Sequence, residues 1–502
     1  MTTIPAALAT AAERAPDRTA LVTDEVRWSF AELQEEVRRG ARALHAAGVR
    51  RGDRVGVWAP NSHRWAVTTL GAVSLGAVLV PVNTRFKGEE ARFCLERVGA
   101  SLLVVDDAFL TCLLGTDPVE ALGLDVAVVR MSQWEAFLAA GDADLDVDAL
   151  AASVTDDDAC DIVFTSGTTG RPKGVVARHG ASVRLFQTWA DTVGLAEGER
   201  MLVVAPFFHT FGYKAGLLAC LLQTATCLPL PVFDVDEAVR VIDAEQVSVV
   251  PGPPTLFSSL LEHPRGGSLT SLRLAVTGAA VVPQVLVERM RSDLGFDTVI
   301  TAYGLTECGG FATGCRVGDS DELVATTSGR AVDGVEVKVV SAEGTDLPPG
   351  EPGEVWIRSY AVMSGYWDDE AATAEAVTPD GWLRTGDVGV MDAAGNLRIT
   401  DRIKDMYVVG GFNAYPAEIE QVLLRHEAVA DVAVIGVPDE RLGEVGKAFV
   451  VPRPGVPLDP SELLAWSRER LANYKVPRSV ELVDLLPRNA GGKVTKNVLR
   501  AR

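Results

Sequence analysis

The chain has 502 residues, a formal net charge of −21 at pH 7 and a hydrophobic fraction of 47%. At about 150 residues per domain, this length predicts roughly two to four folding units, with ample apolar residues for large cores. The acidity argues against nucleic acid as a partner, because a nucleic-acid-binding protein needs a basic face.

The cysteines and the hydrophobic runs predict an intracellular, non-membrane protein. The seven cysteines are odd in number, scattered and without a C-x-x-C pair, so we expect buried thiols of a reducing compartment rather than disulfides or zinc ligands. No apolar run reaches 18 residues, and the nearest, 205–231, is interrupted by His209, Lys214 and Gln223. The first residues lack the basic and apolar regions of a signal peptide. We therefore expect a cytoplasmic protein with no integral membrane segment.

The first 150 residues alternate between strand-like and helix-like segments. This order is typical of a parallel sheet with helices on both faces. The acidic stretch 141–158 has no metal-loop spacing and is interpreted as a solvated surface connection. The expected helices are 30–48 and 65–75, and the expected strands are 54–58, 76–82 and 101–105.

A second doubly wound unit follows. Ligands of such sheets bind beyond the carboxyl ends of the strands, where His209, Gly278 and Tyr303 stand here. The expected strands are 201–205, 226–230, 247–250, 272–277 and 298–302, separated by helices at 208–223, 234–245, 255–262 and 283–293.

From about residue 325 the pattern becomes antiparallel. Residues 334–340 and 353–358 alternate as half-exposed strands, and 388–399 predicts a hairpin. Residues 401–405 are charged and short of core side chains, so we interpret them as a hinge between a large domain, 1–400, and a small one, 406–502. Within the small domain we expect helices at 416–426 and 459–472 and strands at 432–435, 448–451 and 479–483, which make an α+β unit.

The most informative stretch is 165–174, Thr-Ser-Gly-Thr-Thr-Gly-Arg-Pro-Lys-Gly, between two apolar strands. Its hydroxyls, its glycine-freed N–H groups and Lys173 suit a phosphate chain. The spacing is not that of a Walker A loop. A flexible Gly/Thr-rich turn is the alternative interpretation.

Other residues would complete a site that joins a carboxylic acid to a nucleoside triphosphate. Such a reaction needs positive charge, a divalent ion and a held ribose. Glu307 is a candidate oxygen ligand for Mg²⁺, and Asp387 with Arg402 could hold the ribose hydroxyls. Tyr303 offers a face for adenine, and Lys493 lies in a glycine-rich loop that could carry an ammonium into the site.

Each of these residues also has a purely structural interpretation. Glu307 and Lys493 could be solvated surface charges, and Asp387 a turn residue. Arg402 could belong to an ion-paired linker, and His209 could cap a helix.

The joint occurrence of these stretches resembles the adenylate-forming superfamily of acyl-CoA synthetases, aryl-CoA ligases, luciferases and peptide-synthetase adenylation domains. The resemblance covers essentially the whole chain. The matching motifs are 165–174, 206–209, 303–307, 385–387, 401–405, 410–418 and 492–493.

The resemblance implies an α/β fold whose large N-terminal domain has two doubly wound α/β subdomains plus a distorted β-barrel, and a small mobile α+β C-terminal domain. It implies ATP, Mg²⁺ and coenzyme A, with the small domain turning about Lys404. One orientation brings in Lys493 for adenylation, and the other presents Gly410, Gly411 and Phe412 to coenzyme A.

The resemblance assigns the individual residues as follows. The catalytic candidates are Lys493, His209, Lys173 and Thr306, and Glu307 is the metal ligand. The nucleotide contacts are Thr165, Ser166, Gly167, Thr168, Thr169, Lys173, Gly278, Ala279, Ala280, Thr301, Ala302, Tyr303, Gly304, Thr306, Asp387, Arg402 and Lys493. The acyl pocket is formed by Phe211, Gly212, Cys308, Gly309 and Gly310.

The residues of the acid-binding segment limit the class of acid that we expect as substrate. No carboxylate stands in 207–212, where amino-acid-activating members carry an aspartate, so the acid should lack an α-amino group. The pocket flanks are neutral and largely apolar, and Gly309 and Gly310 are expected to leave room. The length leaves no space for the insertion typical of fatty acyl-AMP ligases.

Closer motifs resemble the steroid-catabolism branch, whose acid is an indane-dione propanoate. Medium- or long-chain fatty acids and transfer to a carrier protein remain alternatives. A non-catalytic binding protein would be expected to lack Lys493 or Glu307. The partners expected are a small carboxylic acid, ATP and coenzyme A, and a homodimer is one assembly that the sequence allows.

Overall fold

The computed structural model describes residues 2–166, 172–278, 282, 284–341, 343–402, 407–414, 416–487, 494 and 496–500. It divides into two compact units. Unit 1 comprises 1–84, 95–163 and 174–401, and unit 2 comprises 85–94, 164–173 and 402–502.

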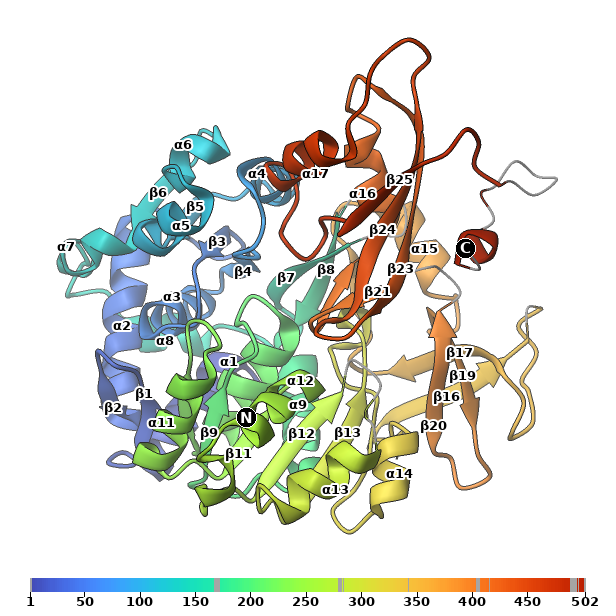
Figure 1. Ribbon diagram of the computed structural model, residues 1–502. Helices are drawn as coiled ribbons and strands as arrows, with labels where there is room; N and C mark the ends of the chain where they lie inside the picture. The colour runs from blue at the N-terminus through green and yellow to red at the C-terminus, as the bar shows by residue number, and fades with distance from the viewer. Residues whose placement is uncertain are drawn as a thin grey trace. The chain divides into compact units, whose positions relative to one another are not determined.

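The first sheet has seven strands in the order β18-β8-β7-β4-β3-β5-β6 (Figure 1). The pairs of β3 with β4 and β5, of β4 with β7 and of β5 with β6 are parallel, as the β-α-β pattern predicts. Its strands are β3 (Arg54–Trp58), β4 (Val78–Pro81), β5 (Leu102–Val105), β6 (Ala127–Arg130), β7 (Ala159–Ser166), β8 (Pro172–Arg178) and β18 (Gly365–Tyr366). The helices that precede or connect these strands are α2 (Phe30–Ala46), α3 (His63–Ser74), α4 (Gly88–Val98), α5 (Asp107–Leu114), α6 (Pro118–Leu122), α7 (Trp134–Ala139) and α8 (Val147–Ala152).

The second sheet has nine strands in the order β15-β14-β13-β12-β11-β9-β10-β1-β2. Its five central strands run parallel, so their carboxyl ends meet at one edge. The strands are β1 (Thr19–Val22), β2 (Arg27–Ser29), β9 (Arg200–Val203), β10 (Thr226–Pro229), β11 (Val249–Pro251), β12 (Leu274–Gly278), β13 (Thr298–Tyr303), β14 (Thr313–Gly314) and β15 (Arg330–Ala331). The helices are α1 (Ile4–Arg14), α9 (His179–Val193), the π-helix η2 (Phe211–Leu218), α10 (Ala219–Leu222), α11 (Val235–Glu245), α12 (Pro254–Glu262), α13 (Gln284–Ser292) and α14 (Asp321–Thr326).

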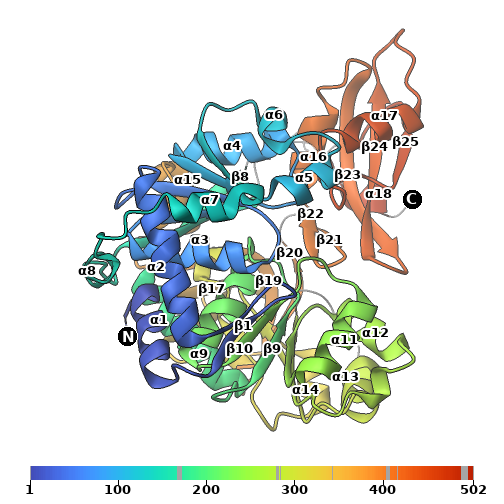
Figure 2. The ribbon, with the colours of Figure 1, turned by 90° about the vertical axis from the view of Figure 1, so that its left-hand side faces the viewer.

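Helices α2 and α3 pack closely, with α1 beside them (Figures 1 and 2). A Cβ on Gly40 would lie 2.5 Å from Val67 Cγ1, and a Cβ on Gly71 would lie 3.0 Å from the Ala41 nitrogen. Glycine at both positions therefore lets the two helix backbones approach. One continuous hydrophobic cluster joins the first and second sheets and extends to the third sheet of unit 1.

A third, antiparallel sheet has the order β16-β17-β19-β20 and stands where the sequence predicts the distorted barrel. It consists of β16 (Val335–Val340), β17 (Gly353–Ser359), β19 (Leu383–Met391) and β20 (Leu397–Arg402), with α15 (Glu370–Ala376) before β19.

Unit 2 has a core of its own, centred on Tyr407, Ile419 and Val434. Its sheet has the order β22-β21-β24-β23, with β25 paired to β24. The strands are β21 (Tyr407–Val409), β22 (Phe412–Ala414), β23 (Val429–Asp439), β24 (Gly443–Pro452) and β25 (Ser479–Leu482), and the helices are α16 (Pro416–Leu423), α17 (Pro460–Arg468) and α18 (Lys496–Arg500). The predicted α+β character of this region is confirmed.

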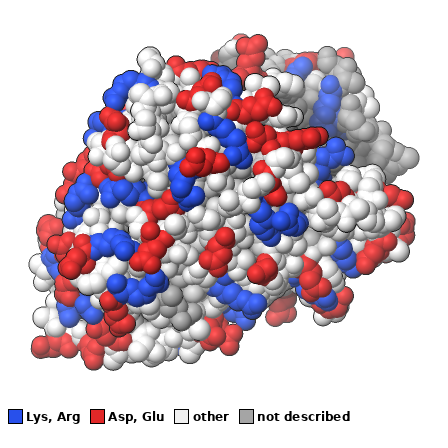
Figure 3. Space-filling view, turned by 90° about the horizontal axis from the view of Figure 1, so that it is seen from below, with Lys and Arg blue, Asp and Glu red and all other residues white. Residues whose placement is uncertain are grey.

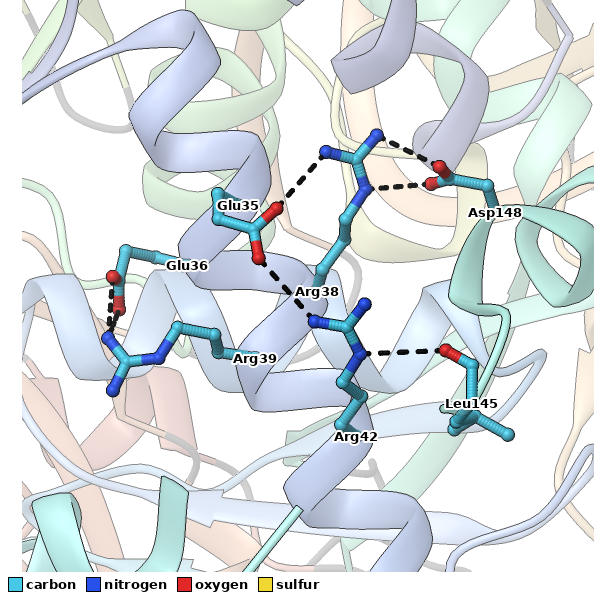
Figure 4. Close-up of polar contacts among 7 residues, drawn as sticks. All are labelled: Glu35, Glu36, Arg38, Arg39, Arg42, Leu145 and Asp148. Atoms are coloured by element: carbon cyan, nitrogen blue, oxygen red, sulfur yellow. Dashed lines mark hydrogen bonds and ion pairs between the residues drawn. The ribbon is translucent and has the colours of Figure 1, made fainter. Parts of the chain in front are cut away.

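The acidic stretch 141–158 is anchored rather than merely solvated (Figure 4). It contains α8, and Asp148 there accepts two hydrogen bonds from Arg38 of α2, at 3.0 and 2.9 Å. Glu35 bridges Arg38 and Arg42, and Arg42 also donates to the Leu145 carbonyl. Arginines spaced along α2 thus contact two points of this segment, although each exposed pair contributes little stability.

Charges elsewhere on the surface are mixed. On the face shown in Figure 3, Lys and Arg side chains lie among Asp and Glu side chains. Ion pairs such as Arg289 with Asp293 and Arg265 with Asp243 are typical of the described surface. None of the described helices has both the length and the apolar character needed to cross a membrane.

Candidate active site

The predicted phosphate loop joins two neighbouring strands of the first sheet. Thr165 and Ser166 end β7, and Lys173 is the second residue of β8, so the strand-turn-strand prediction is confirmed for its described part. The loop's predicted contacts Gly167, Thr168 and Thr169 lie outside the described residues.

A second group of predicted contacts gathers where β12 and β13 end. Gly278 is paired with Ala302 across these parallel strands. The φ of Gly278 is +158°, and a Cβ there would lie 2.8 Å from the Ala302 carbonyl oxygen. This close approach of the two strands requires glycine at position 278. Ala279 and Ala280 lie outside the described residues.

Tyr303 and Asp387 are joined by a direct hydrogen bond between their side chains. The Tyr303 hydroxyl donates to Asp387 Oδ2 at 2.6 Å, and the Asp387 N–H donates to Thr385 Oγ1 at 3.1 Å. Asp387 is only 1% exposed. Burial, and then the Asp387 charge, raise the pKa of Tyr303 well above its usual value, so its hydroxyl remains a donor. The structure therefore brings the predicted adenine and ribose contacts together.

The loop after β13 is closely folded on itself. A Cβ on Gly304 would lie 2.5 Å from both the Gly310 carbonyl carbon and the Phe311 nitrogen. The Leu305 carbonyl accepts hydrogen bonds from the N–H groups of Cys308 and Gly310. Thr306 begins the short 3₁₀ turn η4 (Thr306–Cys308) and is half-buried.

Glu307 is positioned through both its backbone and its side chain. Its carbonyl accepts from the Met363 N–H at 2.8 Å, and Tyr366 donates to Oε1 at 3.0 Å. Among the described residues no group of three or more His, Cys, Asp or Glu side chains could hold a metal. A single half-buried carboxylate fits Mg²⁺, which takes few protein ligands and completes its shell with phosphates and water.

Thr301 has a different environment from its neighbours. It is 4% exposed, and its hydroxyl donates to the carbonyls of Val324 and Thr327, at 2.8 and 2.9 Å. The hydroxyl thus holds the end of α14 against β13. A nucleotide contact by Thr301 stays a prediction.

The acid-binding segment begins at His209. This side chain is exposed, and its Nδ1 accepts the Phe211 N–H at 3.3 Å. We expected one helix from 208 to 223, whereas Phe211–Leu218 forms the π-helix η2. A Cβ on Gly212 would collide with the carbonyls of Ala205 and Pro206, so the tight packing of this first turn depends on glycine. Turns of π-helix, which are wider than those of an α-helix, are common at functional sites.

Helix α9 supplies residues that sequence reasoning missed. Ser182, Leu185, Phe186 and Trp189 have the spacing of one helical face and are all buried. Trp189 lies edge-on to Phe211, with ring centroids 6.5 Å apart. The helical spacing of these apolar residues within 179–193 can be read from the sequence. The packing of this helix against η2 cannot.

The expectation that Gly309 and Gly310 leave room is wrong. A Cβ on Gly309 would lie 2.7 Å from Leu185 Cδ2, and one on Gly310 would lie 2.8 Å from Thr210 Cγ2. These side chains already fill the space beside the glycines, whose φ values of +81° and +98° are the stronger reason for glycine.

The Cys308 thiol stabilises its own loop and is not a reactive group. Its sulfur donates to the Leu305 carbonyl at 3.2 Å, and the residue is 1% exposed. Burial raises the pKa of the Cys308 thiol to about 11, so it is neutral and unreactive at physiological pH.

In unit 2, Gly410 and Gly411 form the two-residue turn between β21 and β22, with φ values of +55° and +84°. Positive φ at both positions is the type I′ pattern that suits a hairpin. Phe412 follows and stacks on Tyr474, with ring centroids 5.0 Å apart. The side chain of Arg402, and all of Lys404 and Lys493, lie outside the described residues.

Comparison with known proteins covers the whole chain. The family model of the AMP-binding enzyme matches residues 8–367, and that of the AMP-binding enzyme C-terminal domain matches 418–493. A 3-[(3aS,4S,7aS)-7a-methyl-1,5-dioxo-octahydro-1H-inden-4-yl]propanoyl:CoA ligase of Mycobacterium tuberculosis is 50% identical over 514 residues, covering 99% of this chain and 98% of that protein. The ligase of the same name from Rhodococcus jostii is 48% identical, with the same coverage. The solved o-succinylbenzoate CoA synthetase of Bacillus subtilis, bound with a product analogue, superimposes with a TM-score of 0.85 at 30% identity, covering 99% of this chain and 98% of that one.

Proposed function

We propose a propanoate on a fused, ketone-bearing ring system as the acid substrate of this chain, which belongs to the AMP-binding family of adenylate-forming enzymes and is an AMP-forming acid–CoA ligase. The observation that carries the substrate proposal is the 50% identity, over 99% of the chain, to a ligase named for a dioxo-octahydroindenyl propanoate. The neutral, largely apolar surroundings of Phe211 and Gly309 support it, because they suit a hydrophobic acid without a second carboxylate.

The reaction proceeds in two steps. The acid's carboxylate oxygen attacks the α-phosphorus of ATP, which forms an acyl-adenylate and releases pyrophosphate. The thiol of coenzyme A then attacks the acyl carbon, which gives the thioester and releases AMP.

In the first step we assign the phosphates to the loop that ends in Lys173, whose charge would offset that of the pyrophosphate leaving group. Asp387, held by Tyr303, would accept hydrogen bonds from the ribose hydroxyls, and we assign Arg402 as a further ribose contact. Glu307 is the residue that would hold Mg²⁺, which would supply positive charge to offset that of the phosphates. Lys493 would stabilise the charge that develops at the attacked phosphorus.

In the second step we assign the path of the thiol to the hairpin turn Gly410–Gly411 of unit 2. The domain boundaries 1–400, 401–405 and 406–502, with Lys404 as the pivot, form part of this proposal. A change of orientation between the two steps would let Lys493 and the hairpin turn serve the same acyl group in succession.

The test is acid-dependent AMP release with ATP, Mg²⁺ and CoA. The panel contains the dioxo-octahydroindenyl propanoate, linear acids of about six to sixteen carbons and a phenylpropanoid. We expect the fused-ring acid to have the highest kcat/KM by at least about 100-fold. A linear acid with the highest kcat/KM would reject the substrate proposal. Omission of CoA should stop turnover after the acyl-adenylate, whereas turnover restored only by a carrier protein would reject coenzyme A as the acceptor.

A further inference from the structure

Strand β19 carries a bulge that ends at the buried carboxylate of Asp387. Strands β17 and β19 are neighbours in the third sheet of unit 1 (Figure 1). Their pairing shifts between Glu354 and Trp356, where a single residue of β17 lies opposite residues 385–387 of β19. We call these residues the 385–387 bulge. Bulges bend a strand and redirect its side chains, and they are common beside active sites.

Hydrogen bonds tie the 385–387 bulge to β17 at Thr385 and Gly386. The Thr385 hydroxyl donates to the Val355 carbonyl at 2.6 Å. The Gly386 N–H donates to Glu354 Oε1 at 3.1 Å. Gly386 has a φ of +71°, a conformation that the backbone keeps only where its surroundings hold it. The Glu354 carboxylate is therefore one of the groups that hold the bulge in shape.

Trp356 orients the Glu354 carboxylate. The indole Nε1 donates to Glu354 Oε2 at 2.8 Å, so the two carboxylate oxygens accept from different partners. The cross-strand partners of Trp356 are Lys338 of β16 and Arg384 of β19. Their cationic groups lie 5.3 and 5.4 Å from the Trp356 ring centroid, which is the range of cation–π contacts. Side chains from three neighbouring strands thus hold the indole that orients Glu354.

The direction of the Asp387 side chain depends on the bulge. Asp387 Oδ2 accepts the Tyr303 hydroxyl at 2.6 Å, and the Asp387 N–H donates to Thr385 Oγ1 at 3.1 Å. Because Asp387 is only 1% exposed, close packing leaves its side chain little freedom to compensate for a displaced backbone. A shift of the bulge would therefore move the carboxylate.

We propose that Glu354 is a positioning residue of the ATP site, which fixes the 385–387 bulge so that the Asp387 carboxylate meets the ribose hydroxyls. In this role Glu354 acts through the Gly386 N–H and does not itself touch the nucleotide. The inference rests on the proposed function, in which Asp387 accepts hydrogen bonds from the ribose.

The role predicts a change in the recognition of the ribose, which a loss of stability alone would not produce. The wild-type enzyme should use ATP with a kcat/KM at least about 10-fold above that for 2′,3′-dideoxyATP, because the analogue lacks both hydroxyls that would bond to a charged carboxylate. Glu354→Met has a side chain of similar length without an acceptor. In this variant we expect the preference to fall to within about threefold of unity, and KM for ATP to rise about 10-fold with KM for the acid unchanged.

The rescue variant is Glu354→Gln/Trp356→Phe. Since the indole donor is removed, the amide oxygen of the new side chain is left to accept the Gly386 N–H, and the preference should return to within about threefold of the wild-type value. The matched control is Glu336→Met on the neighbouring strand β16, which removes a carboxylate that pairs with Arg358. This control should retain the wild-type preference. Thermal unfolding establishes which variants are folded.

The outcomes separate the two proposals. Equal use of ATP and 2′,3′-dideoxyATP by the wild-type enzyme would overturn the ribose assignment of Asp387, and with it this inference. A wild-type preference that persists in folded Glu354→Met, or that does not return in the folded rescue variant, would overturn the role of Glu354 and leave the ribose assignment standing. Where Glu354→Met does not fold, hydrogen exchange of the wild-type enzyme decides. The Gly386 amide should exchange at least about 10-fold more slowly than in an unfolded peptide, and an unprotected amide would overturn the role.

Discussion

Tyr303 donates a 2.6 Å hydrogen bond to Asp387, and this bond joins the last residue of β13 to a buried carboxylate on β19, 84 positions later in the chain. The two strands belong to different sheets of unit 1. A single phenolic hydroxyl thus positions the carboxylate that we assign to the ribose.

Removal of that hydroxyl should weaken nucleotide binding. In Tyr303→Phe we expect KM for ATP to rise about 10-fold with little change in KM for the acid, and the free energy of unfolding to fall by about 1 to 3 kcal/mol. Steady-state kinetics and urea unfolding measure the two effects. Tyr360→Phe, which removes a weaker 3.4 Å contact with Thr188, is the control. Equal ATP KM values in Tyr303→Phe and the wild-type enzyme would contradict the assignment.

Lys493→Ala should abolish acyl-adenylate formation and leave thioester formation from supplied acyl-adenylate within about threefold of the wild-type rate. The reason is that the proposed role, charge stabilisation at phosphorus, applies to the first step only. Pyrophosphate release measures the first step, and thioester production from synthetic acyl-adenylate measures the second. Similar losses in both steps would rule out this role.

Gly411→Leu should have the opposite selectivity. The φ of +84° strains any residue with a side chain, and Leu would also narrow the proposed path of the thiol. We expect adenylation to persist while thioester formation falls at least about 100-fold. Gly455→Leu, at another positive-φ turn of unit 2 with open space around it, controls for backbone strain alone. The proposed path would be wrong if both variants behaved alike.

Gly304→Ala should displace the loop that carries Thr306 and Glu307. The new Cβ would lie 2.5 Å from backbone atoms of Gly310 and Phe311, which move only if the loop moves. We expect a loss of about 1 to 3 kcal/mol in unfolding free energy and a lower adenylation rate. Gly318→Ala, at a φ of +91° in open space, should cost about 1 kcal/mol and leave adenylation unchanged. An adenylation rate unaffected by Gly304→Ala would show that the loop tolerates displacement.

Two buried histidines should make the protein acid-sensitive. Burial lowers the pKa of His63 and of His179 to about 4 in the folded state. In the unfolded chain histidine titrates near about 6.5, so between these values the unfolded state binds more protons. The contribution of these two histidines to the pH dependence of stability should therefore be absent above about pH 6.5, and stability should fall as the pH drops towards 4, by up to about 3 kcal/mol for each histidine. Urea unfolding at pH 7 and pH 5 measures this, and His179→Asn should reduce the difference; an unreduced difference would exclude His179 as a source.

The sequence predicts helices and strands well where the local hydrophobic pattern agrees with the burial of the residues in the fold. The apolar runs of β3, β5 and β13 read directly as parallel strands, and their boundaries fall within one residue of those expected. The residues that follow β13 could be placed at a ligand edge because that edge is a property of the topology.

Features that depend on packing could not be predicted. The π-helical geometry of η2 and the close packing of Gly212 against the carbonyls of Ala205 and Pro206 have no periodic signature in the sequence. Similarly, the bond between Tyr303 and Asp387 and the pairing of Lys214 with Asp161 join segments far apart in the chain. Residue type indicated that these side chains were unusual, but only the fold identifies their partners.

The parallel pairing of β1 with β10, in register at Leu21 and Cys227, has a consequence for biosynthesis. At roughly 5 to 20 residues per second, the ribosome needs about 10 to 40 seconds to add the 206 residues that separate these partners. Through that interval the segment Thr19–Val22 can pair with β2 but lacks β10 and the core side chains that follow it in the chain. The nascent chain is consequently a good client for a chaperone that shields short extended segments, and slower translation would lengthen its exposure to aggregation.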